Sequence, residues 1–251
     1  TPITRIIFEG PDNELNLTEN TQPAIFLASF CIFEIIKKEY GYNFERFKYF
    51  AGHSLGEYSA LACNGAISFE DTLKILQKRG RFMQQAIPSG EGGMLVALGI
   101  SSEEIQKILD GANDTYECYI ANDNSKIQVV LSGLMKDIDL LSKDLETRKI
   151  KNIKLNVSAP FHCKYMKSAS NKMTSFINNL KITKLNKPII SPFKTYSNNP
   201  CDNNQSCVYA LCDIDNPKNI MCISKIPDLY AFFLENSDVY TIDDKLAKIN
   251  F

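Results

Sequence analysis

The sequence predicts an α/β protein built from two lobes, and three observations lead to this prediction. The apolar segment 47–51 runs into Gly52 and then into a helical pattern, which is typical of a buried strand that turns sharply into a helix. From residue 92 to residue 157, the pattern follows a strand–helix–strand–strand–helix–strand order. Helical periodicity returns beyond that stretch. A compact module is therefore expected as an insertion in a larger α/β domain.

The composition is that of a globular protein, and it excludes some partners. Of the 251 residues, 44% are hydrophobic and 23% are charged, which is ordinary. A formal net charge of -1 gives no field that would attract a polyanion, so no nucleic-acid partner is expected. The longest apolar stretch, 24–33, is too short to cross a bilayer, and the first ten residues lack a secretory signal. We therefore expect a cytoplasmic protein with no membrane partner.

Three helices are expected in the first part of the chain. The triplet Thr21-Gln22-Pro23 places a capping hydroxyl just before a proline, which predicts a helix over 21–40. A second helix is expected over 54–64. Ser68 is followed three residues later by an acidic residue, a pattern typical of a capped N-terminus, and this predicts a third helix over 68–86.

The inserted module has the element order of a ferredoxin-like unit. Its strands are expected at 94–99, 116–121, 127–131 and 153–157, and its helices at 101–109 and 135–147. The chain then divides into a first part of the large α/β domain, the ferredoxin-like subdomain, and a second part of the large domain with an unassigned tail, at 1–91, 92–157 and 158–251.

The end of the chain carries little pattern. A helix over 166–180 and a strand over 188–191 are expected, but beyond them only 227–235 has a clear helical pattern. The eight cysteines of the chain are scattered, which predicts free thiols in a reducing compartment. Four cysteines gather in the tail without any C-x-x-C pair, so neither zinc nor another metal is expected there: Cys201, Cys207, Cys212 and Cys222.

The pentapeptide Gly52-His53-Ser54-Leu55-Gly56 matches G-x-S-x-G and lies between the predicted strand and helix. Such a turn holds the serine in strained backbone space, and small neighbours let the turn close against the sheet. The N–H of Leu55 then points free at the helix N-terminus, where the helix dipole favours an oxyanion. We interpret Ser54 as a nucleophile, and the alternative is a chance match in a turn rich in Gly and Ser.

A serine nucleophile needs a base that works near neutral pH, and the chain has only two histidines. His53 is adjacent to Ser54 and its side chain should point away from the hydroxyl, so we expect it to support the turn. His162 remains as the expected base. A packed histidine in a loop is the alternative interpretation of His162.

Four stretches, in order and spacing, resemble motifs of the malonyl-CoA:acyl carrier protein transacylases. They are TENTQPA at 18–24, GHSLGEYSAL at 52–61, RGRFMQ at 79–84, and the segment 158–166 around His162. The resemblance covers roughly Glu9 to Ser191. It implies an α/β-hydrolase-like large domain with an inserted ferredoxin-like small subdomain, which agrees with the pattern described above.

The resemblance implies a reaction. Ser54 would attack the thioester of malonyl-CoA, release coenzyme A, and pass the malonyl group to the phosphopantetheine thiol of an acyl carrier protein. His162 would take and return the proton, and Leu55 would supply one oxyanion N–H. Members of this family orient the histidine with a backbone carbonyl, so no triad aspartate is expected. No cofactor is implied, since coenzyme A enters as the thioester substrate.

The resemblance also implies that Arg79 binds the malonyl carboxylate, a task that suits a planar bidentate donor. Periodicity favours Arg79 over Arg81, because Arg79 flanks the apolar stripe of its helix and Arg81 points further away. Without the resemblance, an arginine on an exposed helix face would be the preferred interpretation.

Four further residues are implied at the substrate pocket. Met83, one turn after Arg79, would line it, and the ring of Phe161 would leave no space for an extra methyl group and so favour malonyl over methylmalonyl. Asn122 and Asn124 would lie at the mouth of the site. Core packing explains Met83 equally well, and turns at a strand end explain the two asparagines.

Two motifs of the family are not found. No segment like F-P-G-Q-G-S, whose glutamine would supply the second oxyanion N–H, precedes Glu9. After Ser191 there is neither a segment like the one whose carbonyl orients the histidine nor an E-x-G-P-G-like turn. We therefore expect a chain truncated at the N-terminus and divergent at the C-terminus, with weak or no activity.

Three other functions remain open. A serine esterase, thioesterase or lipase of the α/β-hydrolase type shares G-x-S-x-G, but it would use an acidic triad residue and no buried carboxylate clamp. A polyketide acyltransferase domain is a nearer relative and would belong to a multidomain protein. A catalytically dead paralogue would only bind the acyl carrier protein or coenzyme A.

Overall fold

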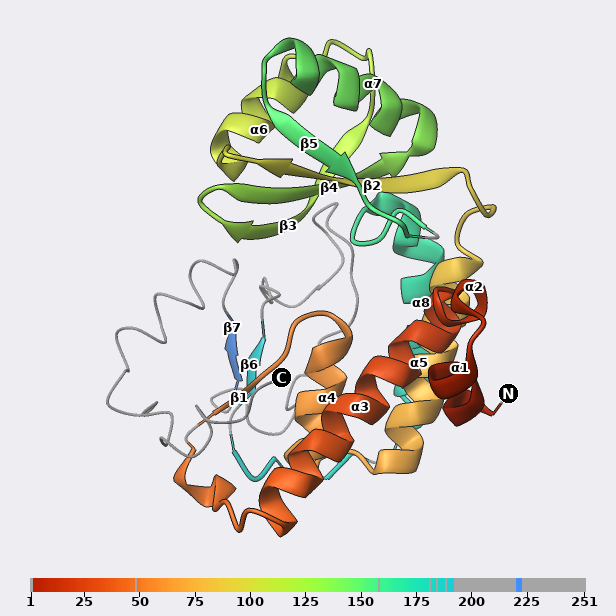
Figure 1. Ribbon diagram of the computed structural model, residues 1–251, viewed down its shortest axis with the longest axis vertical. Helices are drawn as coiled ribbons and strands as arrows, with labels where there is room; N and C mark the ends of the chain where they lie inside the picture. The colour runs from red at the N-terminus through yellow and green to blue at the C-terminus, as the bar shows by residue number, and fades with distance from the viewer. Residues whose placement is uncertain are drawn as a thin grey trace.

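The computed structural model describes residues 2–47, 49–157, 159–180, 182–183, 185–187, 189–191 and 220–222. These residues form a mixed α/β fold with two separate sheets, as predicted, and each sheet belongs to its own lobe (Figure 1). The chain builds most of the large lobe, enters the small lobe at residue 92, and returns to the large lobe after residue 154.

The large lobe combines helices with a three-stranded parallel sheet of order β1-β6-β7. Its core is formed by side chains of the helices packed against β6, including the fully buried Phe26, Ile75 and Leu76. The elements are α1 (Ile3–Glu9), α2 (Asp12–Leu15), α3 (Thr18–Lys38), η1 (Phe44–Arg46), β1 (Phe50–Ala51), α4 (Leu55–Cys63), α5 (Phe69–Gln84), η2 (Lys164–Met166), α8 (Lys167–Ile177), β6 (Ile189–Ser191) and β7 (Ile220–Cys222).

The start of α3 was predicted wrongly. The sequence pattern places Thr21 before the helix and Pro23 in its first turn, but α3 begins at Thr18 and contains Pro23. The hydroxyl of Thr21 donates to the carbonyl of Leu17, one turn earlier, rather than capping a new N-terminus. Pro23 lies beyond the first turn of α3, so the helix lacks the hydrogen bond that an N–H at this position would donate to the carbonyl of Glu19.

The other predicted elements of the large lobe are present with shifted ends. Ser68 caps α5 and accepts a hydrogen bond from the N–H of Asp71, as predicted. The strand predicted over 47–51 is reduced to β1, and α1 and α2 have no counterpart among the predicted elements. The predicted helix over 227–235 lies outside the described residues, as does the cysteine cluster of the tail apart from the backbone of Cys222.

The small lobe contains a four-stranded antiparallel sheet of order β3-β4-β2-β5, with α6 and α7 on its outer side (Figure 1). The serine before α6, Ser101, forms a reciprocal capping box with Glu104. The elements follow one another in the predicted order: β2 (Gly92–Leu98), α6 (Ser102–Asp110), β3 (Cys118–Ser125), β4 (Gln128–Leu134), α7 (Met135–Thr147) and β5 (Lys151–Lys154).

The two central strands of this sheet, β2 and β4, are mostly buried, and each face of the sheet packs on a different partner. On the outer face, Leu95 and Leu131 belong to a core shared with α6 and α7. On the inner face, Val96 and Val130 belong to a second cluster that includes Phe161, from the loop before η2. The inner face of the small sheet therefore supports the loop that carries the predicted catalytic histidine.

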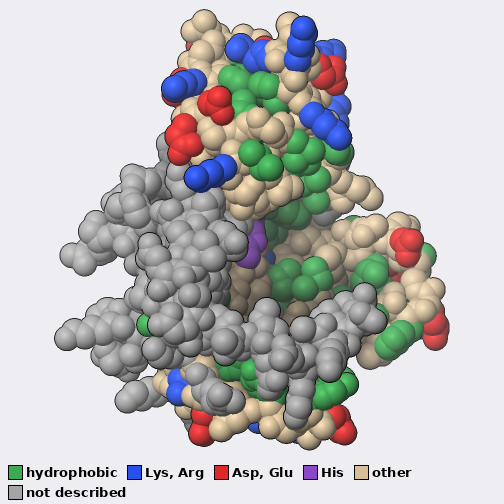
Figure 2. Space-filling view, turned by 60° about the vertical axis from the view of Figure 1, so that its left-hand side comes forward, with side chains coloured by type: hydrophobic (Ala, Val, Ile, Leu, Met, Phe, Trp, Pro, Cys, Tyr) green, Lys and Arg blue, Asp and Glu red, His purple; other side chains and the backbone are tan. Residues whose placement is uncertain are grey.

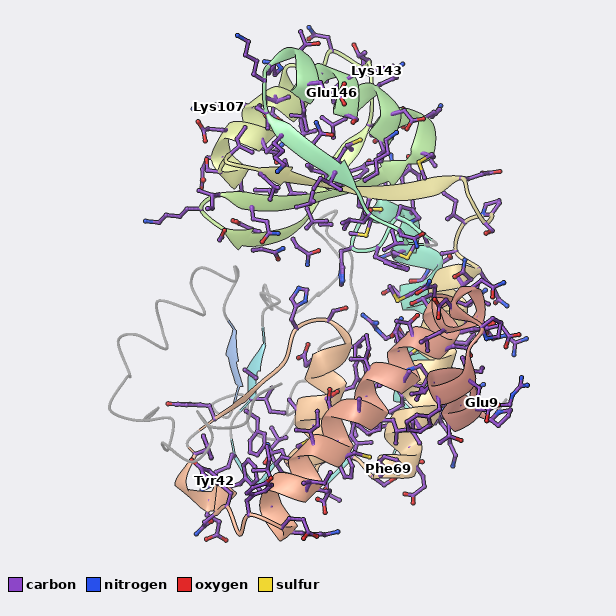
Figure 3. All side chains as sticks on the ribbon, viewed as in Figure 1. Glu9, Tyr42, Phe69, Lys107, Lys143 and Glu146 are labelled. Atoms are coloured by element: carbon purple, nitrogen blue, oxygen red, sulfur yellow. The ribbon has the colours of Figure 1, made fainter. Side chains whose placement is uncertain are left out.

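Figure 3 labels three charged side chains of the small lobe. Lys107, Lys143 and Glu146 project from α6 and α7 on the side of the lobe that faces away from the large lobe. Among the described residues, none of the helices combines the length and apolar character that a bilayer-spanning segment needs.

Helices α3 and α5 cross at Gly80, where their backbones are in close contact. A Cβ at this position would lie 2.3 Å from the carbonyl oxygen of Thr18 and 2.6 Å from the Cα of Glu19. Backbone atoms cannot move aside as a flexible side chain would, so the crossing distance depends on glycine. The residue that precedes this contact in α5 is Arg79.

We predict that Gly80→Ala lowers the free energy of unfolding by about 1–3 kcal/mol, because the added methyl group overpacks the helix crossing. Chemical denaturation of the two proteins measures this difference. Gly56→Ala is the matched control, because Gly56 is also helical but a Cβ there meets nothing within 4 Å. Equal stability of Gly80→Ala and the unsubstituted protein would contradict the close crossing.

Candidate active site

Ser54 lies at a strained junction between β1 and α4. It is the residue before the first turn of α4, with φ 55° and ψ -114°. A non-glycine residue in such a conformation costs about 1–3 kcal/mol. The turn closes because Gly52 has no side chain, since a Cβ there would lie 1.9 Å from the carbonyl oxygen of Gly56. A Cβ at Gly56 would meet nothing within 4 Å, so lack of space does not explain why this position is a glycine.

The first N–H groups of α4 differ in their hydrogen-bond partners. The N–H of Gly56 donates to the carbonyl of His53 (2.9 Å), and that of Glu57 donates to the carbonyl of Ser54 (3.3 Å). The N–H of Leu55 has no backbone acceptor among the described residues. As the first N–H of the helix, it remains available to a developing negative charge beside Ser54.

The structure brings His162 to Ser54. The distance between Ser54 Oγ and His162 Nε2 is 3.1 Å, although the two residues are 108 positions apart. His162 is buried and has φ 57°, so this residue also adopts a strained backbone conformation. Burial, followed by the nearby charge of Arg79 and then by His53, lowers the pKa of His162 to about 3. The imidazole is therefore neutral near pH 7, and its Nε2 lies beside the Ser54 hydroxyl.

Arg79 reaches the same oxygen. Its Nη2 donates to Ser54 Oγ at 3.1 Å, and the side chain is only 1% exposed. Burial lowers the pKa of the guanidinium, and the neighbouring Tyr58 and Glu57 oppose that shift. Arg81, the competing candidate in the same helix, is exposed. A buried cation therefore lies within hydrogen-bond distance of the candidate nucleophile.

Met83 and Phe161 pack together next to these polar groups. Met83 is 3% exposed and belongs to a cluster with Ala159. Phe161 contacts this cluster and also the cluster on the inner face of the small sheet. The ring therefore lies where the two lobes meet, one residue before His162.

The two predicted mouth residues differ in their contacts. Asn122 lies on β3, and its Nδ2 is 2.8 Å from Nε2 of His53, so the amide links the small lobe to the residue before Ser54. Asn124 follows it on the same strand, at a break in the strand register. No hydrogen bond joins Asn124 to Ser54 or to His162 among the described residues, and its role stays a prediction.

Three polar residues near Arg79 were not assigned a role from the sequence. Gln22 of α3 accepts a hydrogen bond from Nη1 of Arg79, Tyr58 hydrogen-bonds the guanidinium, and Glu57 is a buried carboxylate in the first turn of α4. Each lies inside a motif quoted for the family resemblance. The available signal was the presence of polar residues on helix faces that are otherwise apolar.

The site opens into a hollow between the lobes. Figure 2 shows a histidine side chain at the bottom of this hollow, below the small lobe. A cavity of about 640 Å³ adjoins the turn at Ser54, and its walls include Ile25 and Phe33 of α3 and Phe44 of η1. No group of three or more potential metal ligands occurs among the described residues.

Comparison with known proteins gives consistent results. The acyl transferase domain family matches residues 2–220. The malonyl CoA-acyl carrier protein transacylase of Bacillus subtilis strain 168 is 39% identical over 193 residues, which cover 76% of this chain and 60% of the relative. The protein of the same name from Haemophilus influenzae is 37% identical over 191 residues, or 74% of this chain and 58% of the relative. The chain thus spans about 60% of the length of these relatives.

Solved structures share the fold. The malonyl CoA-acyl carrier protein transacylase of Coxiella burnetii has a TM-score of 0.78 and 30% identity, covering 94% of this chain and 71% of that one. A malonyl-transacylase solved in complex with its type II polyketide synthase acyl-carrier protein has a TM-score of 0.78 and 27% identity, covering 94% of this chain and 73% of that one.

We predict that His162 makes the protein less stable in mild acid. The pKa of His162 is about 3 in the folded protein and about 6.5 for an exposed imidazole. Between these values the unfolded chain binds a proton that the folded chain does not, so the free energy of unfolding falls as the pH falls below about 6.5. Above that pH this contribution is constant.

Denaturation at pH 7.5 and pH 5 measures the effect. The loss of stability between the two pH values should be greater by about 2 kcal/mol in the unsubstituted protein than in His162→Gln, which has no imidazole to charge. The comparison cancels the titration of the carboxylates, which both proteins share. Identical pH dependence of the two proteins would show that His162 titrates normally in the folded state.

Proposed function

Because the chain belongs to the acyl transferase domain family, we propose that it transfers a malonyl group from malonyl-CoA to the phosphopantetheine thiol of an acyl carrier protein, in fatty-acid synthesis. The observation that carries this proposal is the surroundings of Ser54 Oγ, which lies 3.1 Å from a neutral imidazole and 3.1 Å from a buried guanidinium. The names of the bacterial relatives and the carrier-protein complex of one structural neighbour support the same substrate and partner.

The proposal includes a finer description of the fold. We interpret the large lobe as an α/β-hydrolase-like domain and the small lobe as a ferredoxin-like subdomain inserted at 92–157. The parallel strand β1 that leads into Ser54 and α4 supports the first assignment. The antiparallel order β3-β4-β2-β5, with α6 and α7 on one side, supports the second.

The first half-reaction forms a malonyl-serine. His162 Nε2 accepts the Ser54 proton as Oγ attacks the thioester carbon, and the carbonyl oxygen becomes an oxyanion beside the N–H of Leu55. Collapse of the intermediate breaks the carbon–sulfur bond, and His162 returns the proton to the thiolate of coenzyme A. A neutral imidazole is required at the start, and the burial that lowers the pKa of His162 provides it.

The second half-reaction reverses these roles. His162 accepts a proton from the phosphopantetheine thiol, whose sulfur attacks the malonyl ester of Ser54, and the proton then returns to Ser54 Oγ. The acyl group only changes its thioester partner, so neither a metal nor a redox cofactor takes part in the proposed reaction. Coenzyme A takes part as the leaving group.

Arg79 supplies the preference for an acyl group that carries a free carboxylate. Its buried guanidinium makes no ion pair with a carboxylate among the described residues, and its Nε has no hydrogen-bond partner there. A malonyl carboxylate would supply the missing acceptors and the missing charge. We propose that Met83 and Phe161 line the same pocket, with the Phe161 ring favouring malonyl over methylmalonyl, and that Asn122 and Asn124 lie at its mouth.

A serine esterase is a poorer match to this site. Hydrolysis of an uncharged ester does not need a buried cation on the nucleophile, and burying an unpaired charge is costly. The hydrogen bond between Arg79 and Ser54 therefore favours a substrate with a negative charge close to its reacting carbonyl group.

We predict that the purified chain gains the mass of one malonyl group on Ser54 when it is mixed with malonyl-CoA, and that Ser54→Ala gains none. A single-turnover measurement by intact mass detects the malonyl-serine directly, which a coupled assay does not. Malonyl transfer to added acyl carrier protein should then remove the adduct. No adduct after prolonged incubation with saturating malonyl-CoA would contradict the proposal and favour a catalytically dead binding protein.

We further predict that Arg79→Ala slows acylation by malonyl-CoA about 100-fold or more and changes acylation by acetyl-CoA less than about threefold, because only malonyl loses a charged hydrogen-bond partner. Rates of adduct formation with the two thioesters measure this. Arg81→Ala is the matched control from the same helix and should behave as the unsubstituted protein. An equal loss with both thioesters would assign Arg79 to the fold or to the chemistry of Ser54 rather than to carboxylate recognition.

A further inference from the structure

The TENTQPA motif of α3 has no role in the reaction described above, yet it contains a buried polar residue that contacts Arg79. Gln22 is 3% exposed and lies in the second turn of α3, near the apolar Ala24 and Phe26. A buried amide has to be hydrogen-bonded, since leaving it unpaired is costly. Its hydrogen-bond partners therefore indicate what it does.

Gln22 makes three contacts, and its partners determine the orientation of its amide. Its Oε1 accepts a hydrogen bond from Nη1 of Arg79. Its Nε2 donates to Thr18 Oγ1 (2.9 Å) and to Met83 Sδ (3.5 Å). A guanidinium has only donors, so the oxygen of the amide must face Arg79. Thr18 and Met83 then hold the other end of the amide.

The two ends of the guanidinium are consequently occupied by different groups. Nη1 donates a hydrogen bond to Gln22 Oε1, and Nη2 donates one to Ser54 Oγ. Because the guanidinium is planar, a hydrogen bond at Nη1 restricts its rotation. The position of Nη2 relative to Ser54 then depends on Gln22. The distance between the bound carboxylate and the reacting carbonyl then depends on this contact too.

We propose that Gln22 is a positioning residue that holds Arg79 in register with Ser54, and so determines the selectivity for acyl groups that carry a carboxylate. The inference rests on the proposed malonyl transfer and assigns a role in it to the TENTQPA motif. Gln22 does not touch the reacting atoms, and it acts through the guanidinium.

The neutral charge of Gln22 is part of this role. A glutamate at the same position would also accept from Arg79, but it would neutralise the guanidinium and compete with the substrate carboxylate. Glutamine provides the acceptor and leaves the positive charge for the substrate. Ser54 and Tyr58, which also hydrogen-bond Arg79, are uncharged too, and burial raises the pKa of Tyr58 to about 12.

The close crossing of α3 and α5 makes the contact possible. Gly80 follows Arg79 and packs against the backbone of Thr18, which is the residue that holds the Gln22 amide. A wider crossing would move Gln22 away from the guanidinium. Gly80 of α5 and the Thr18–Gln22 pair of α3 therefore both help to keep Gln22 within hydrogen-bond distance of Arg79.

The test compares Gln22→Met and Gln22→Glu in single-turnover acylation of Ser54 by malonyl-CoA and by acetyl-CoA, using the full chain. Gln22→Met keeps the length of the side chain and removes the acceptor. We expect it to slow acylation by malonyl-CoA about 10- to 100-fold and acylation by acetyl-CoA less than about threefold. Gln22→Glu should slow acylation by malonyl-CoA further and leave the unfolding midpoint near that of the unsubstituted protein.

Asn20→Ala is the matched control. It removes an amide from the same helix, but that amide donates to the backbone carbonyl of Glu14 at 2.9 Å and not to Arg79. This variant should keep the rates with both thioesters. It measures how far a general weakening of α3 affects the site.

Two results would overturn the inference. One is an equal loss with malonyl-CoA and acetyl-CoA in Gln22→Met, which would make Gln22 a structural residue of the core. The other is recovery of malonyl acylation in Gln22→Glu, because a purely structural role needs only the acceptor. Failure of the proposed function is distinguishable, since it would appear as the absence of a malonyl adduct in the unsubstituted chain.

Discussion

The hydroxyl oxygen of Ser54 is the point on which the site depends. Two side chains reach it, one 25 positions later in the chain and one 108 positions later, each at 3.1 Å. They can do so because the turn at Gly52 forces the serine out of regular backbone conformation and presents its oxygen at the start of α4. Without that turn, Arg79 and His162 would have no common partner.

Burial surrounds both partners of the Ser54 hydroxyl, the imidazole of His162 and the guanidinium of Arg79. It lowers the pKa of His162 far enough to keep the imidazole neutral, which is the state a general base needs. It also leaves the guanidinium of Arg79 in contact with the uncharged acceptors Gln22 and Ser54 rather than in an ion pair. Among the described residues this guanidinium makes no ion pair, although the buried carboxylate of Glu57 is near enough to oppose the lowering of its pKa.

The small lobe contributes to the site through the strand and loop that border the hollow. Asn122 of β3 contacts His53, the neighbour of Ser54. Glu117, just before the same strand, forms an ion pair with Lys164, two residues after His162. Phe161 packs on the inner face of the sheet. The relative position of the lobes therefore affects both sides of the Ser54–His162 pair.

Local sequence determined the elements and the strained turn at Ser54, because their causes lie within a few residues. The glycine of the turn, the cap of α5 and the order of strands and helices all follow from neighbours in the chain. The start of α3 was placed wrongly because Thr21 bonds one turn back instead of capping. Only the tertiary structure decided that Arg79 is buried on Ser54, that Gln22 holds it, and that Asn122 contacts His53. These contacts depend on how closely two helices cross and how two lobes meet, and no local pattern encodes such distances.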